Sequence, residues 1–124
     1  MATPIGNMRD ITLRALDVLN GADLVACEDT RVFAKLASHY GIKAPTIAYS
    51  DATQDAAEPR LVRALEKGQR VALVSDAGMP LISDPGYRLV RTALARGLAV
   101  TSAPGPSAVP MALALSGLPT DRFY

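Results

Sequence analysis

The chain has 124 residues, 13 Lys and Arg against 12 Asp and Glu, a formal net charge of +1, and 49% hydrophobic residues. One compact domain fits this length. The apolar fraction argues against a disordered chain, which needs low hydrophobicity and high net charge. The balanced charge argues against a dedicated basic arm for nucleic acid, so any basic surface has to be local.

Cysteine content and the apolar pattern bear on the compartment. The single Cys27 cannot form an internal disulfide, so nothing requires an oxidising environment. No apolar run approaches the roughly 20 residues that span a bilayer. The first residues lack the basic and apolar regions of a signal peptide. We therefore expect a cytoplasmic protein without a membrane segment.

Four short apolar runs predict β-strands. They are nearly continuous rather than alternating, which is typical of parallel strands that are covered on both faces. The runs lie at residues 24–27, 46–49, 71–74 and 98–101.

Helical patterns fill the gaps between these runs. The first predicted helix runs from Asp10 or Thr12 to Leu19, with Leu16 and Leu19 on one apolar face, and the second covers residues 30–40. The third starts near Pro59 and stops at Gly68, which leaves residues 50–58 as the expected mobile stretch. The fourth has Asp84 as cap and Pro85 in its first turn, ends at Gly97, and turns Tyr87, Val90, Ala93 and Leu94 inward. The fifth follows Pro106 and Ser107 and ends at Gly117.

This order predicts one α/β domain over residues 1–124, with an open, mostly parallel sheet and helices on both faces. A βαβ protein normally opens with a strand, whereas this chain opens with a Pro-Ile-Gly-Asn turn at residues 4–7. The pattern therefore indicates that a first strand is missing from the front.

Ligands of open α/β sheets bind beyond the carboxyl ends of the strands, so the segments after each strand are the candidate sites. Residues 75–86 and 103–108 combine Gly, Pro and small residues, which let a backbone approach a ligand closely. Residues 3–7 form a turn, and residues 28–31 bring two carboxylates next to an arginine. Simpler interpretations stay open, because Asp84, Pro85 and Ser107 can each merely start a helix.

Several common motifs are absent. The chain has no G-x-G-x-x-G, no G-x-x-x-x-G-K-[ST] and no G-x-S-x-G, which argues against a dinucleotide fingerprint, a P-loop and a nucleophile elbow. Cys27 and His39 cannot build a zinc site between them, so we expect no metal. His39 is expected to be an exposed or capping residue.

Read together, several segments do resemble a known family. They lie at residues 2–7, 10–16, 27–31, 71–78, 82–86, 104–108 and 116–119. In that order and spacing they are similar to the ribosomal RNA small-subunit methyltransferase I family, whose members are 2′-O-methyltransferases of the tetrapyrrole-methylase superfamily. The resemblance covers essentially the whole chain.

The resemblance implies a function. The family transfers a methyl group from S-adenosylmethionine to the 2′-hydroxyl of a cytidine in 16S ribosomal RNA of the small ribosomal subunit. Its fold has two α/β domains with the cofactor in the cleft between them, and related enzymes are homodimers. This chain would be the N-terminal, cofactor-side domain.

The resemblance also implies site residues. Those placed against the cofactor are Pro4, Gly6, Asp76, Ala77, Gly78, Met79, Ile82, Ser107 and Ala108. Glu28 and Arg31 would face the substrate. A base must accept the hydroxyl proton, and Asp29 is the candidate because it follows a strand end.

The sequence departs from the family pattern. Met79 stands where the family usually has Thr, and residues 50–53 replace a His-Asn-containing stretch. The strand expected before Ala2 and the second domain are also missing. Other interpretations therefore stay open: a domain that methylates carbon atoms of a corrin or porphyrin, or a catalytically silent ligand-binding or dimerising module. An ordinary flavodoxin-like domain is disfavoured by the absent phosphate loop.

Overall fold

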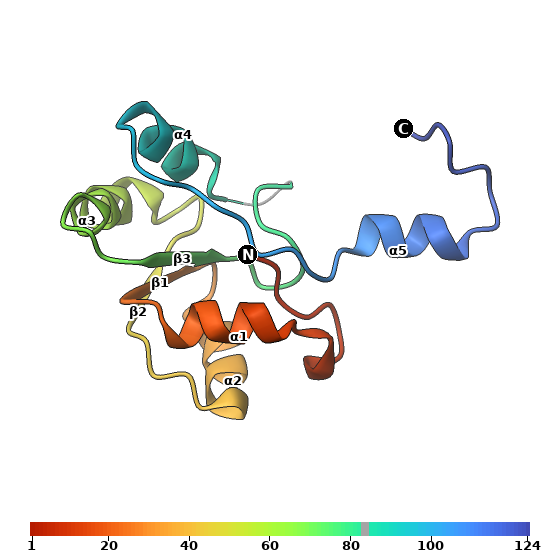
Figure 1. Ribbon diagram of the computed structural model, residues 1–124, viewed down its shortest axis with the longest axis horizontal. Coiled ribbons are helices and arrows are strands. Elements are labelled where there is room, and N and C mark those ends of the chain that lie inside the picture. The colour runs from red at the N-terminus through yellow and green to blue at the C-terminus, as the bar shows by residue number, and fades with distance from the viewer. Residues whose placement is uncertain (83–84) are drawn as a thin grey trace.

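The computed structural model describes residues 1–82 and 85–124. Its elements, in chain order, are η1 (Met8–Asp10), α1 (Leu13–Asn20), β1 (Leu24–Cys27), α2 (Thr30–Tyr40), β2 (Thr46–Ala48), α3 (Gln54–Glu66), β3 (Val71–Val74), α4 (Tyr87–Ala95) and α5 (Ala108–Leu115) (Figure 1). Helices and strands alternate through most of the chain, as the sequence predicts.

The three strands form one parallel sheet in the order β2-β1-β3. In the register, Val25 of β1 lies opposite Thr46 of β2 and Ala72 of β3. Because all three strands run the same way, their carboxyl ends meet at one edge of the sheet. The predicted α/β class with a parallel sheet is confirmed.

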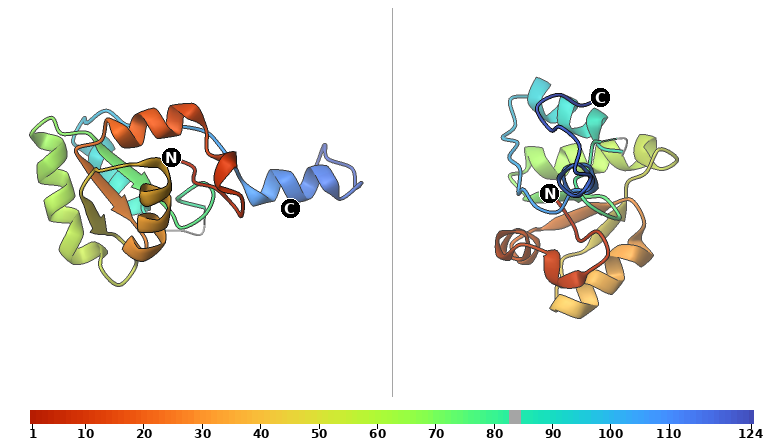
Figure 2. Two further views of the ribbon diagram at one scale, coloured as in Figure 1. Left: turned by 90° about the horizontal axis from the view of Figure 1, so that it is seen from below. Right: turned by 90° about the vertical axis from the view of Figure 1, so that its right-hand side faces the viewer.

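Each face of the sheet carries its own hydrophobic core. Successive side chains of a strand point to opposite faces, so β1 sends Val25 and Cys27 into one core and Leu24 and Ala26 into the other. Helices α1 and α2 close the first core, and α3 and α4 close the second (Figure 2). This two-sided cover explains why the strands read as continuous apolar runs rather than alternating ones.

The first two helices begin and end where the sequence predicts, because their caps are local. Thr12 accepts a hydrogen bond from the backbone N–H of Ala15 at 3.0 Å, which selects Thr12 over Asp10 as the cap of α1. Asp29 caps α2 through the N–H of Arg31. Gly41 ends α2 in the left-handed conformation, at φ 69°.

The start of α3 corrects the prediction. The helix begins at Gln54 and contains Pro59, so residues 54–58 are helical rather than part of a mobile stretch. Contacts with α4 favour this first turn, since Arg88 pairs with Asp55 at 2.6 Å and with Glu58 at 3.4 Å. These ion pairs between α3 and α4 outweigh the local preference of Pro59 for the first turn of a helix, on which the prediction was based.

Helix α4 also differs from the prediction. It begins at Tyr87 with Gly86 as N-cap, so Pro85 lies before the helix, and the predicted cap Asp84 lies outside the described residues. Leu89 and Ala93 are the buried positions, whereas Tyr87 and Leu94 are exposed rather than turned inward. The hydroxyl of Thr92 donates to Glu58 Oε1 of α3 at 2.8 Å, so packing against α3 selects the buried face.

The fourth predicted strand does not form. Residues 98–101 are not assigned to any strand, and most of this segment is exposed. A strand exists only through hydrogen bonds to a neighbour. Here a groove separates the segment from β3, so those partners are out of reach.

Helix α5 follows Ser107, as predicted, but leaves the body of the domain (Figure 1). It has no buried residue; Met111 is 52% and Leu115 82% exposed. Within residues 1–82 and 85–124, no helix combines the length and apolarity that crossing a membrane requires.

Candidate functional site

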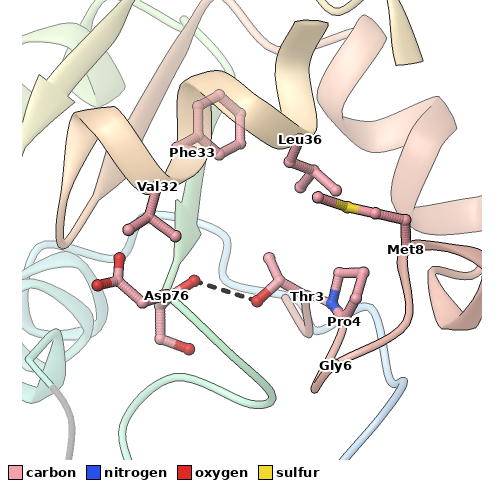
Figure 3. Close-up of a pocket in the computed structure, with 9 residues that line it drawn as sticks. Thr3, Pro4, Gly6, Met8, Val32, Phe33, Leu36 and Asp76 are labelled. Carbon is pink, nitrogen blue, oxygen red and sulfur yellow. Dashed lines mark hydrogen bonds between the residues drawn. The ribbon is translucent and has the colours of Figure 1, made fainter. Parts of the chain in front are cut away.

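A small pocket lies at the carboxyl end of the sheet, where the turn at residues 3–6 meets the start of the loop after β3 and the first turns of α2 (Figure 3). Its volume is about 150 Å³. The lining residues are Thr3, Pro4, Gly6, Met8, Val32, Phe33, Leu36, Ser75 and Asp76. The wall is mostly apolar, and Asp76 brings a carboxylate to it.

Thr3 anchors the first residues of the chain to the loop after β3. Its backbone N–H donates to the carbonyl of Gly78, and the N–H of Gly78 donates back to the carbonyl of Thr3, both at 3.0 Å. The buried Thr3 hydroxyl donates to the carbonyl of Ser75 at 3.1 Å. This double attachment fixes the turn of Pro4 to Gly6 against the loop before any ligand binds.

Two glycines allow the loops to approach one another closely. Gly78 has φ 75°, and a Cβ there would lie 3.4 Å from Ile5 Cγ2 and 3.6 Å from the carbonyl oxygen of Pro106. A Cβ on Gly105 would lie only 2.9 Å from Ala2 Cβ. The turn at residues 2–6, the loop after β3 and the segment at residues 104–107 therefore meet largely through backbone, which leaves carbonyl and N–H groups near a common point.

The carboxylate of Asp29 is held by its own helix. It accepts hydrogen bonds from the Arg31 backbone N–H at 2.8 Å and from the Arg31 guanidinium at 2.6–3.2 Å. These bonds from Arg31 lower the pKa of Asp29 to about 2. The backbone N–H of Asp29 donates to Asp76 Oδ1 at 3.0 Å and so links the loops after β1 and β3. Asp29 is thus a fixed, weakly basic anion.

Cys27 lies beneath these carboxylates. Burial, and after it the negative charges of Asp76 and Asp29, raise the pKa of the Cys27 thiol to about 11. A thiol with this pKa stays protonated at neutral pH, so Cys27 packs in the core rather than acting as a nucleophile.

The structure brings some of the predicted site residues together and leaves others apart. Pro4, Gly6 and Asp76 line the pocket, and Gly78 is paired to Thr3 beside it. Ala77 is exposed in the same loop, whereas Met79 turns toward the groove beside β3 and Ile82 is 62% exposed. The remaining predicted residues do not line the pocket. Ser107 and Ala108 lie at the start of α5, and Glu28 and Arg31 follow β1.

Sequence reasoning missed the contribution of α2 to the pocket. Val32, Phe33 and Leu36 supply much of the apolar wall, but their spacing reads simply as the buried face of an amphipathic helix. Phe33 and Leu36 do belong to the core, at 4% and 5% exposure, and also border the pocket. Thr3 belongs to the turn at residues 3–7 that the sequence indicates as a candidate segment, but only the structure shows that its side chain is 3% exposed and hydrogen-bonded across the fold.

Metal ligation finds no support in the part of the chain that the structure describes. Among residues 1–82 and 85–124, no three His, Cys, Asp or Glu side chains are grouped so that they could hold a metal ion. The carboxylates of Asp29 and Asp76 lie near each other, but Arg31 and backbone N–H groups already bind them.

A comparison with protein families decides the assignment. The profile of the tetrapyrrole (corrin/porphyrin) methylases matches residues 2–124. The chain belongs to this family. The resemblance inferred from the sequence motifs is thereby confirmed, and the parallel sheet with helices on both faces is consistent with a tetrapyrrole-methylase fold.

Three similar proteins carry the same name. The chain is 58% identical over 123 residues to the ribosomal RNA small subunit methyltransferase I of Mesorhizobium japonicum, and 52% identical over 121 residues to that of Escherichia coli O157:H7. The protein of that name from Halalkalibacterium halodurans is 48% identical over 123 residues. The matches cover 98–99% of this chain but only 42–43% of each relative. The chain therefore spans less than half the length of these relatives.

Proposed function

We propose that this methylase chain is the N-terminal, cofactor-side half of an S-adenosylmethionine-dependent methyltransferase acting on the 2′-hydroxyl of a cytidine in 16S ribosomal RNA. One observation carries the proposal: nearly every residue of the chain aligns, at 48–58% identity, with proteins named ribosomal RNA small subunit methyltransferase I. Such a substrate, within the small ribosomal subunit, would be met in the cytoplasm.

The size of the pocket supports a site that holds only part of such a cofactor. Its volume of about 150 Å³ is below the roughly 300–1,000 Å³ of sites that enclose a drug-sized ligand. A pocket of this volume would form one side of a larger cleft, and a second domain would supply the opposite side. The residues proposed to hold the cofactor on this side are Pro4, Gly6, Asp76, Ala77, Gly78, Met79, Ile82, Ser107 and Ala108.

Methyl transfer mainly requires that the methyl donor and the attacking hydroxyl be aligned. When bound, S-adenosylmethionine supplies a methyl group already activated on a sulfonium centre. Holding two reactants in a near-attack geometry can contribute about 7–11 kcal/mol. The loops at residues 3–6 and 75–78 suit this task, since Thr3 ties them together through three hydrogen bonds. Asp76 presents an exposed carboxylate that can accept a hydrogen bond from a ligand hydroxyl or amine.

Asp29 is the proposed proton acceptor, with Glu28 and Arg31 facing the substrate. The pKa of about 2 makes Asp29 a weak base, so an Asp29→Asn variant of the two-domain protein is the decisive test. Asn caps helices about as well as Asp, so α2 should stay intact. A large loss of kcat with unchanged cofactor affinity supports the assignment, whereas full kcat assigns Asp29 to capping alone.

Calorimetric titration with S-adenosylmethionine tests the cofactor assignment. The 124-residue chain and a longer protein that carries the second domain would be titrated side by side. Binding to the longer protein alone supports a cleft built from two halves. If neither binds, the proposed function fails, and the alternative of a silent module is favoured.

Asp76 offers a residue-level test with a matched control. In the longer protein, Asp76→Asn should weaken S-adenosylmethionine binding about tenfold or more, because a charged acceptor is lost. Asn keeps an oxygen for the N–H of Asp29. The control is Asp17→Asn, an exposed carboxylate in the second half of α1, before the amino end of β1. Equal affinities in the two variants would remove Asp76 from the site.

The proposal includes a homodimer. The exposed apolar side chains of α5, among them Val109, Met111 and Leu115, support burial against another protein surface. Light scattering of the longer protein should give twice the monomer mass. A monomer at high concentration would contradict this part of the proposal.

A further inference from the structure

The outer face of α2 and the residues that follow it hold a local excess of positive charge. Residues 30–50 contain Arg31, Lys35 and Lys43 but no Asp or Glu, whereas the whole chain has a net charge of only +1. These three residues are exposed, and so is His39. A chain of balanced overall charge therefore presents a locally basic surface.

Helix geometry places these side chains in a row. Arg31, Lys35 and His39 are four residues apart, so they lie on one face of α2, about 6 Å from one another along the helix axis. Phe33 and Leu36 turn another face of the helix into the core. A nucleic-acid strand likewise carries its negative charges at a short, regular repeat. The row therefore matches the charge pattern of such a strand.

The ammonium groups of Lys35 and Lys43 are available to an anion. Within residues 1–82 and 85–124, no carboxylate forms an ion pair with either of them. Arg31, by contrast, is bound by the carboxylate of Asp29 at 2.6 Å. The two lysines therefore supply most of the attraction that this surface offers to phosphate groups.

The basic row adjoins the pocket at the carboxyl end of the sheet. Val32, next to Arg31 and one turn from Lys35, is 38% exposed and lines the pocket (Figure 3). At the other end of α2, the hydroxyl of Tyr40 donates to the carbonyl of Met8 at 2.6 Å, and Met8 lines the pocket as well. A polymer that lies along α2 therefore reaches the pocket.

His39 adds an exposed aromatic ring to this row. Its ring packs edge to face against the ring of Tyr40, with the centroids 4.6 Å apart and an interplanar angle of 86°. Because Tyr40 is itself hydrogen-bonded to Met8, the ring of His39 has a fixed support. Aromatic rings next to basic side chains are typical stacking platforms for the unpaired bases of RNA.

We propose that the outer face of α2 is a docking surface for single-stranded RNA, with Lys35 and Lys43 bound to phosphates and His39 stacked on an unpaired base. The strand would run along α2 and bring its reacting nucleotide to the pocket. The choice of RNA as the occupant rests on the proposed function. An unpaired strand is favoured because the stacked pairs of a duplex leave no base face free for His39.

Binding of a fluorescent single-stranded RNA of about 20 cytidines tests the surface directly. Fluorescence anisotropy gives Kd at several salt concentrations for the longer protein that carries the second domain. The test variant combines Lys35→Gln with Lys43→Gln. The matched control combines Arg60→Gln with Arg63→Gln, which removes two exposed charges from α3 on the other face of the sheet.

We expect the lysine variant to bind the RNA about tenfold or more weakly at about 0.1 M salt. Each phosphate contact of a single strand contributes about 0.7 to the slope of log K against log salt concentration, so this slope should fall by about 1.4. The arginine control should keep the original Kd and slope. Equal Kd values in the two variants would overturn the proposal, as would the absence of binding by the original protein.

His39 has its own test, which separates stacking from charge. At about pH 8, where histidine is ordinarily neutral, His39→Ala should weaken RNA binding about fivefold or more with the salt slope unchanged. His39→Phe keeps an aromatic ring and should restore the affinity. Equal affinities of these two variants would overturn the stacking role. Polyglutamate that binds as tightly as the RNA would overturn the choice of RNA and assign the surface to an acidic protein.

Methyl transfer to purified small ribosomal subunits that lack the methyl group distinguishes this proposal from the proposed function. If the original protein transfers methyl groups, the lysine variant should raise KM for the subunits about tenfold or more with kcat unchanged. An unchanged KM overturns the docking surface and leaves the proposed function intact. If the original protein transfers none but binds RNA through the two lysines, the proposed function fails and the docking surface stands.

Discussion

The hydroxyl of Thr3 donates a hydrogen bond to the carbonyl oxygen of Ser75, 3.1 Å away and 72 positions along the chain. Both residues are buried. The bond joins the first turn of the chain to the loop after β3, and these two segments line the pocket at the carboxyl end of the sheet. The geometry of the pocket therefore depends on a contact between residues that are remote in sequence.

Replacing Thr3 should loosen this connection. Thr3→Val keeps the shape but leaves the buried carbonyl of Ser75 without this donor, which should lower the free energy of unfolding by about 1–3 kcal/mol. Thr3→Ser keeps the hydroxyl and is the matched control, with a smaller loss from its missing methyl group. Urea unfolding measures both. Equal losses in the two variants would show that the hydroxyl contributes nothing.

Gly105 should not tolerate a side chain. A Cβ there would lie 2.9 Å from the Cβ of Ala2, so Gly105→Ala should cost about 1–3 kcal/mol of unfolding free energy. Combining it with Ala2→Gly removes the opposing methyl and should recover part of that loss. Thermal unfolding of the four proteins gives the coupling between the two sites. Strict additivity would place the strain elsewhere.

The N-cap of α1 offers a prediction about helix capping. Thr12 accepts from the Ala15 N–H at 3.0 Å, so Thr12→Ala should lower the unfolding free energy by about 1 kcal/mol. Thr12→Ser retains the capping oxygen and should cost less. Chemical unfolding of the two variants, compared with the original chain, checks this order, and the reverse order would contradict it.

Cys27 should make the chain less stable at high pH. Its pKa is raised from 9.0 to about 11 in the folded protein, mainly by burial, so the unfolded state releases its proton first as pH rises. The stability present below about pH 9 should fall between about pH 9 and 11. In Cys27→Ala this share of the loss should vanish. Unfolding curves across that range, together with slow thiol labelling of the folded chain, measure the effect.

Asp29 should respond to the loss of its partner. Hydrogen bonds from Arg31 hold the pKa of Asp29 at about 2, so Arg31→Gln should raise this pKa toward its ordinary value of 3.8. The contribution of ionised Asp29 to stability is present above the unfolded pKa and is lost as pH falls toward 2. Carbon NMR of the carboxyl group follows the titration directly. An unchanged pKa in Arg31→Gln would contradict the role given to Arg31.

Local signals determined much of this protein. The continuous apolar runs predict β1, β2 and β3 because strands covered on both faces leave no polar positions, and Thr12, Asp29 and Gly41 mark helix ends through bonds or backbone angles within a few residues. The ordered motifs in the loops after these strands predict the family, which the profile match confirms. The loops themselves need small residues wherever backbones approach closely.

Only the tertiary structure decided the remainder, because it depends on partners distant in sequence. Residues 98–101 have strand-like composition but lack a neighbour across the groove, so no strand forms there. Helix α3 begins before Pro59, where Arg88 of α4 reaches Asp55 and Glu58. Likewise, Phe33 and Leu36 become pocket walls, and the backbone N–H of Asp29 gains the Asp76 carboxylate as its acceptor, through the meeting of α2 with the loop after β3. Residue types and spacing predict bonds within one element, whereas contacts between elements exist only once the chain has folded.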